Sequence, residues 1–363
     1  MKRHFVVLAG VLCLLLCGCT WMDGSYLSIT PHQEQSSGVQ AKDRTASNYI
    51  QLRDVLKDMI DSGTENAVIN VAGYRQDLVD EGIANAVLYA MERYPLGAYA
   101  VDEISYEVGT GGGQPAISVN ISYIHGRSEI RKIEEVANMS AAQACITDAL
   151  DNCGDSVVIY VNAYEASDLV QVVEDYAKEN PDIVMEMPQV AVGVYPDTGS
   201  SRVVEVKFTY ETSRESLRQM QQQVRRVFAS AQLYINSDAE TAQKYAQLYT
   251  FLMERFDYQL QTSITPAYSL LTYGVGDCEA FASVYAAMCR QAELDCHMVS
   301  GTRDGQSWYW NIIHENGINY HVDLLRCSEK GQFQRLTDEA MERYVWDYSA
   351  HPHADEEKPE VTE

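Results

Sequence analysis

The chain has 363 residues, of which 46% are hydrophobic, and it carries a formal net charge of −25 at pH 7. This share of apolar residues is enough for two or three ordinary cores, so the chain is not disordered as a whole. The acidity and the lack of a run of Lys and Arg argue against a nucleic-acid partner, because binding phosphates requires clustered cations.

The N-terminus predicts an export signal. Lys2 and Arg3 precede an apolar run from residue 5 to 16, which is shorter than the ~20 residues of a membrane-spanning helix. Leu16-Cys-Gly-Cys19 resembles the lipobox of bacterial lipoproteins, which implies a signal peptide over residues 1–18 and lipidation of Cys19. The alternative is an ordinary signal peptide cut near Gly18. Either way we expect export, and the lipobox implies a membrane partner and a lipid-anchored protein on the outer face of a bacterial membrane.

Nine cysteines are present, but Cys13 and Cys17 would leave with the signal and Cys19 would carry lipid. If one of the remaining six stays a free thiol, the others cannot all pair, so no small disulfide framework is expected. Pairing of Cys145 with Cys153, or of Cys289 with Cys296, stays open. No spacing typical of zinc ligands occurs, and we predict neither a metal nor a cofactor.

Residues 19–47 are polar and read as a flexible tether, after which the chain repeats itself. The recurring residues, ninety positions apart, are Asp58, Val68 and Tyr74, then Asp148, Val158 and Tyr164. With a small loop deletion in the second copy, the segment 119–127 recurs as 206–214. We therefore predict two modules, over residues 48–140 and 141–231, which serve as a spacer or a binding surface.

Each module reads as a helix, a strand, a helix, two strands closed by a turn, and a charged helix. The predicted fold class is α+β: two duplicated α/β modules with antiparallel sheets, followed by a third domain over 232–348. His125 has no counterpart in the second module, which favours a solvated loop residue. No group of residues with catalytic chemistry falls inside the modules.

The third domain begins with a helix whose capping box is Ser237 and Glu240, and a second helix is expected from residue 278 to about 293. Three strands follow, over 297–301, 307–314 and 318–324. The turns between them are Arg303-Asp-Gly305 and Glu315-Asn-Gly317. Residues 349–363 read as an acidic, disordered tail.

Cys278 stands where a tight turn becomes a helix. Gly274 and Gly276 permit the turn, and the apolar spacing that follows gives the helix one core face. Free backbone N–H groups and the helix dipole favour a thiolate at this position, so we expect the thiol pKa to fall below its usual ~8.5. The pattern predicts a nucleophile.

Three blocks in this region resemble the transglutaminase-like family of papain-type thiol enzymes. They are Gly274-Val-Gly-Asp-Cys-Glu279, Trp308-Tyr-Trp-Asn311 and Tyr320-His-Val-Asp323. The resemblance implies acyl transfer through a thioester, with Cys278 as the nucleophile and Asp323 orienting a histidine. The histidine position is occupied by Trp308.

Indole has no basic nitrogen, so Trp308 cannot accept the proton of the thiol. His321 is a candidate base only, since two residues along a strand place it near Asp323. We expect Trp308, Tyr309, Trp310, Asn311 and Tyr320 to line a binding cleft.

Two functions stay open for the third domain. The first is a catalytically degenerate domain that binds a peptide, a protein or a cell-wall polymer, or acts in assembly of the cell envelope. The alternative is an active thiol acyl-transfer enzyme (a transglutaminase, amidase or cysteine protease) that uses Cys278, Asp323 and a displaced base. A further alternative makes the repeated modules the working part.

Overall fold

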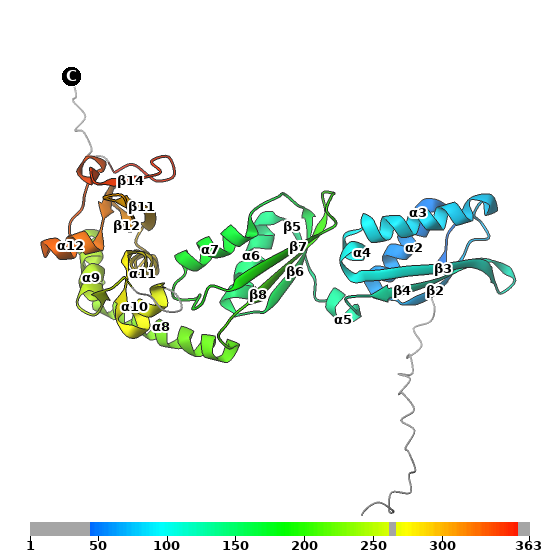
Figure 1. Ribbon diagram of the computed structural model, residues 1–363, viewed down its shortest axis with the longest axis horizontal. Helices are drawn as coiled ribbons and strands as arrows, with labels where there is room; N and C mark the ends of the chain where they lie inside the picture. The colour runs from blue at the N-terminus through cyan, green and yellow to red at the C-terminus, as the bar shows by residue number, and fades with distance from the viewer. Residues whose placement is uncertain (1–43, 261–265, 355–363) are drawn as a thin grey trace, which may run out of the picture.

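The computed structural model describes residues 44–260 and 266–354, which form three units in a row along the long axis (Figure 1). The predicted signal peptide, Cys19, and most of the predicted tether and tail lie outside the described residues. Within the described ranges, no helix is both long enough and apolar enough to cross a bilayer.

The first unit is an antiparallel sheet with helices against one face. Its elements are β1 (Arg44–Thr45), α2 (Tyr49–Ser62), β2 (Asn66–Asn70), a 3-10 turn (Gln76–Leu78), α3 (Val79–Glu92), α4 (Pro95–Ala100), β3 (Val101–Gly111), β4 (Gln114–Tyr123) and α5 (Arg127–Ile130). The strand order is β1-β2-β4-β3, with only β1 parallel to its neighbour. Alternate residues of β4, such as Ile117 and Val119, pack against Leu56 and Ile83 of the helices, because successive side chains of a strand point to opposite faces.

The second unit repeats this arrangement. Its elements are β5 (Glu134–Asn138), α6 (Met139–Asp151), β6 (Ser156–Ala163), α7 (Leu169–Glu179), β7 (Gln189–Tyr195), β8 (Arg202–Thr209) and α8 (Arg214–Tyr234). The order β5-β6-β8-β7 matches that of the first sheet, strand for strand. The duplication is confirmed. The short parallel edge strands β1 and β5 were not predicted, and β5 begins ahead of residue 141.

The two modules meet through an apolar contact. Tyr99, Ala100 and Ile130 of the first module pack with Val203 of the second module's sheet. The ring of His125 stacks on Tyr99, with centroids 4.2 Å apart and an interplanar angle of 5°. His125 is therefore half-buried beside this junction, not the solvated loop residue that the sequence predicted.

The third unit places helices against a four-stranded antiparallel sheet of order β13-β12-β11-β14. Its elements are α9 (Thr241–Met253), β9 (Asp257–Tyr258), α10 (Pro266–Tyr273), β10 (Val275–Gly276), α11 (Cys278–Gln291), β11 (Cys296–Arg303), β12 (Gln306–Glu315), β13 (Ile318–Val322), α12 (Leu324–Lys330), a 3-10 turn (Asp338–Met341) and β14 (Tyr344–Trp346). The three predicted strands are confirmed, and β14 was not predicted.

The turns follow the sequence closely, whereas one helix start does not. Asp304 and Gly305, like Asn316 and Gly317, all have positive φ, as the tight turn between two paired strands requires. Helix α9 begins at residue 241 with Glu240 at its N-cap, so the predicted capping box from Ser237 was wrong.

The second and third units share one hydrophobic core. Leu217 and Phe228 of α8 belong to the same cluster as Leu248 of α9 and Tyr285 of α11. The Ser283 hydroxyl of α11 also donates to the Lys178 carbonyl of α7 at 2.6 Å. The second module is thus packed directly onto the helix that carries the predicted nucleophile.

Candidate functional site

The turn before Cys278 is built as the sequence predicted. Gly274 has φ +80°, and a Cβ on Gly276 would lie 2.8 Å from the Cβ of Ala280. The Asp277 carboxylate accepts the N–H of Ala280 at 3.0 Å and caps α11. Cys278 therefore occupies the first residue of the helix.

The expectation of a lowered thiol pKa was wrong. Burial, together with the negative charges of Asp277 and Asp323, raises the pKa of Cys278 to about 11. The backbone N–H groups of Tyr309 and Glu279 oppose this shift without overcoming it. Burying the thiolate away from water therefore destabilises it more than the partial positive charge of the helix N-terminus stabilises it.

The space beside Cys278 is a small void between packed side chains. It is lined by residues of α11, β12 and the start of α12, among them Phe281, Ala282, Tyr309 and Leu324. It has no room for a water molecule. In this conformation the thiol faces packed side chains and not an open cleft.

Trp308 lies against Asp323, in the place that the resemblance gives to a histidine. Its indole N–H donates to Oδ2 of Asp323 at 2.9 Å. The other oxygen, Oδ1, accepts the N–H groups of Leu325 and Arg326 and so caps α12. Because indole nitrogen only donates, this contact orients the ring but supplies no proton acceptor.

Two further side chains reach Asp323 that sequence reasoning missed. The Tyr344 hydroxyl donates to Oδ2 at 2.6 Å, and a guanidinium nitrogen of Arg303 lies 3.4 Å from the same oxygen. The Arg303 guanidinium also lies 5.1 Å from the centre of the Trp308 ring. Arg303 was placed only in a turn, and no local pattern marked Tyr344, so the sequence carried no signal for either.

His321 is fully buried, and both of its ring nitrogens are occupied. Nδ1 accepts the indole N–H of Trp310 at 2.9 Å, and Nε2 lies 2.8 Å from Oδ1 of Asp338. Among the described residues, no hydrogen bond joins the Cys278 thiol to an imidazole. The arrangement therefore gives His321 a structural network and does not support it as the base.

This network makes a prediction for the pH dependence of stability. Burial lowers the pKa of His321 below its usual 6.5. The unfolded chain then binds more protons than the folded chain below about pH 6.5, so the free energy of unfolding should fall as the pH drops from 7 to 5. In His321→Gln, whose amide can accept from Trp310 and donate to Asp338 without titrating, the slope should be shallower. Equal slopes in chemical denaturation would contradict the assignment.

The residues predicted to line a cleft divide into two groups. Trp310 and Asn311 are fully buried, so neither is open to an external ligand in this structure. The Asn311 amide donates to the carbonyl of Ala282 at 2.9 Å, while its carbonyl oxygen has no partner among the described residues. The other three, Trp308, Tyr309 and Tyr320, are half-buried.

The cysteines outside the site are free thiols in this structure: Cys145, Cys153, Cys289, Cys296 and Cys327. Neither of the two pairings left open by the sequence is formed. In residues 44–260 and 266–354, no group of three or more His, Cys, Asp or Glu side chains could hold a metal ion.

Comparison with known proteins locates the family resemblance in the third unit. Residues 229–338 match the model of the transglutaminase-like superfamily. One similar solved structure is a TGase, with 10% identity, TM-score 0.26, and coverage of 60% of this chain and 63% of the TGase chain. This chain thus spans less than two thirds of that protein.

A second similar structure is a candidate cysteine protease from Cytophaga hutchinsonii, with 12% identity, TM-score 0.25, and coverage of 44% of this chain and 70% of the other. No curated protein matches the chain significantly. The nucleophile turn, strands β11, β12 and β13 of the sheet, and the aspartate all lie inside the matched range. Residues 229–338 of this chain therefore form a transglutaminase-like domain.

Proposed function

We propose that the chain is an exported, lipid-anchored protein whose transglutaminase-like domain has lost acyl-transfer activity and acts in binding or assembly at the cell envelope. The observation that carries this proposal is the indole of Trp308 on Asp323. A papain-type site needs a group there that can take a proton from the thiol, and an indole cannot.

Two further observations support loss of catalysis. A thiol pKa of about 11 leaves only about one thiol in 10⁴ ionised at pH 7. The void beside Cys278 has no room for a water molecule, and still less for an amide group. Each of these would have to change before an acyl substrate could react.

The export and anchoring part rests on the sequence of residues 1–19 alone. Lys2, Arg3, the apolar run and Leu16-Cys-Gly-Cys19 together support cleavage before Cys19 and its lipidation. Two modules between this anchor and the domain would hold the domain away from the membrane. Metabolic labelling with a fatty-acid analogue, abolished by Cys19→Ala, would test this part separately.

The loss of catalysis has a direct test. We expect the wild-type chain and Cys278→Ser to be equally inactive in amide hydrolysis and in coupling a fluorescent primary amine to a glutamine-containing protein. Iodoacetamide should alkylate Cys278 slowly at pH 7, and His321→Gln should leave that rate unchanged. Turnover well above that of Cys278→Ser would overturn the proposal, and a rate lost in His321→Gln would favour the active enzyme.

A further inference from the structure

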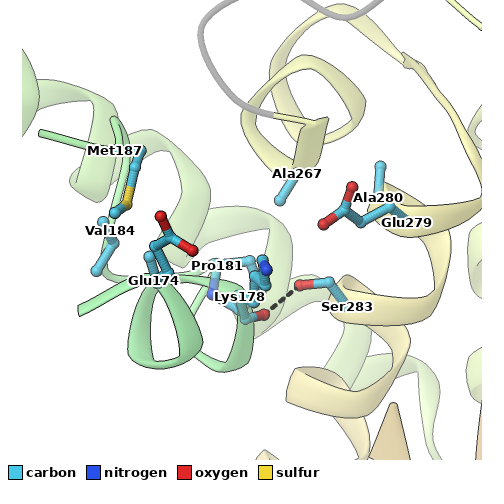
Figure 2. Close-up of a pocket in the computed structure, with 10 residues that line it drawn as sticks. Glu174, Lys178, Pro181, Val184, Met187, Ala267, Glu279, Ala280 and Ser283 are labelled. Atoms are coloured by element: carbon cyan, nitrogen blue, oxygen red, sulfur yellow. Dashed lines mark hydrogen bonds between the residues drawn. The ribbon is translucent and has the colours of Figure 1, made fainter. Parts of the chain in front are cut away.

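A pocket of about 210 Å³ lies between the second module and the transglutaminase-like domain. One wall comes from α7 and the segment after it, and the other from the start of α10 and the first turns of α11 (Figure 2). The pocket therefore exists only because the two units pack together. It lies on the side of α11 that carries Glu279, Ala280 and Ser283, whereas Phe281 and Ala282 line the void beside Cys278.

The walls of this pocket are mainly apolar. Its apolar side chains are those of Ala177, Pro181, Val184, Met187, Ala267 and Ala280. A pocket of this size has room for several water molecules, but its apolar walls offer them no hydrogen bonds. A small organic molecule with an apolar body would displace this water and bury the apolar side chains of the pocket.

Three charged side chains also line the pocket: Glu174, Lys178 and Glu279. Figure 2 shows Glu174 and Lys178 on the α7 side, with the Glu279 carboxylate reaching inward from the opposite wall. None of the three forms a side-chain hydrogen bond or an ion pair with another described residue. Burial raises the pKa of Glu279, as does the charge of Asp277, while Lys178 opposes this shift.

The charges of these three side chains indicate which kind of ligand the pocket would bind. Two carboxylates and one ammonium leave an excess negative charge in the pocket, and the chain as a whole is strongly acidic. A half-buried carboxylate that forms no hydrogen bond or ion pair gains most from a cation that shares its apolar surroundings. A neutral apolar molecule would leave both carboxylates unpaired, and an anion would be repelled by them.

We propose that this pocket binds a small hydrophobic ammonium compound, with its alkyl group between the apolar walls and its cation at the carboxylates of Glu174 and Glu279. The site is separate from Cys278, so it stands or falls independently of whether the transglutaminase-like domain is catalytic. It gives the second module a role beyond that of a spacer, because this module supplies one whole wall.

Titration of the full chain with n-hexylamine, followed by calorimetry or NMR, tests the proposal. Hexanol and hexanoate have the same chain length and carry no charge or a negative charge. We expect hexylamine to bind at least about tenfold more tightly than either. No binding of hexylamine at millimolar concentration, equal binding of hexanol, or tighter binding of hexanoate would overturn the proposal.

Variants locate the binding site. Glu279→Gln and Glu174→Gln keep the shape of each side chain and should each weaken hexylamine binding by about tenfold or more. Asp175→Asn is the matched control, because Asp175 is an exposed carboxylate of the same helix that does not line the pocket. Cys278→Ser should bind normally. If Asp175→Asn weakens binding as much as the two glutamine variants do, the effect is one of general charge, and the proposal fails.

Discussion

Replacing Trp308 by His is expected to lower the pKa of the Cys278 thiol and to raise its alkylation rate at pH 7 by about 10²–10⁴-fold. The indole nitrogen of Trp308 already lies 2.9 Å from Oδ2 of Asp323. An imidazole at residue 308 could donate from one nitrogen to this oxygen and leave the other free to accept a proton. The resulting imidazolium would stabilise the Cys278 thiolate, which burial now disfavours by raising the pKa of the thiol to about 11.

The measurement is the rate of iodoacetamide labelling of Cys278 against pH, read by mass spectrometry of the labelled peptide. Trp308→Phe is the matched control, since it shortens the side chain and removes the indole N–H without adding a base. We expect the apparent pKa of the thiol to fall well below that of the control only in Trp308→His. Equal rates in the two variants would mean that burial, and not the missing base, holds the thiol inert.

Replacing Asp323 by Ala is expected to destabilise the transglutaminase-like domain by about 3–5 kcal/mol. This carboxylate is buried, caps α12, and accepts the Tyr344 hydroxyl and the Trp308 indole. Its removal would also leave Arg303, whose side chain is only 12% exposed, without its buried partner. Losing several charge-assisted contacts at once costs more than losing one surface ion pair.

Chemical denaturation followed by tryptophan fluorescence measures this effect in the relevant part of the chain. Trp308, Trp310 and Trp346 all belong to the third unit. Arg343→Ala is the control: Arg343 pairs with Asp304 on the surface, so its loss should leave the midpoint nearly unchanged. If Asp323→Ala unfolds at the wild-type midpoint, its hydrogen bonds contribute little, and Asp323 would be held in place for another reason.

Local patterns determined much of the architecture. The ninety-residue repeat predicted two modules, and the matching sheets β1-β2-β4-β3 and β5-β6-β8-β7 confirm it. The hairpins at Asp304-Gly305 and Asn316-Gly317 and the turn at Gly274 and Gly276 were readable because backbone conformation there depends on a few adjacent residues. The parallel edge strands β1 and β5 were missed, since two or five residues carry too little periodicity.

The chemistry of the site was harder to predict from the sequence than the fold was. The three blocks around Cys278, Trp308 and Asp323 were enough to predict the transglutaminase-like domain, and the missing base was visible as a residue type. The sequence predicted the wrong direction for the thiol pKa, because a helix N-terminus is a local feature whereas desolvation depends on every element packed around the sulfur. The prediction for His321 failed for the same reason: it lies two residues from Asp323 in the sequence, but its ring contacts Trp310 and Asp338.

The amino-acid sequence by itself thus determined the order of the longer helices and strands, the duplication, the turns and the identity of the residue that stands in place of a base. Only the tertiary structure decided that Arg303 and Tyr344 meet Asp323, that His321 is engaged by Trp310 and Asp338, and that α7 closes a pocket against α11. These contacts join residues far apart in the chain. Their energies come from burial and charge pairing in the packed state, which no local pattern records.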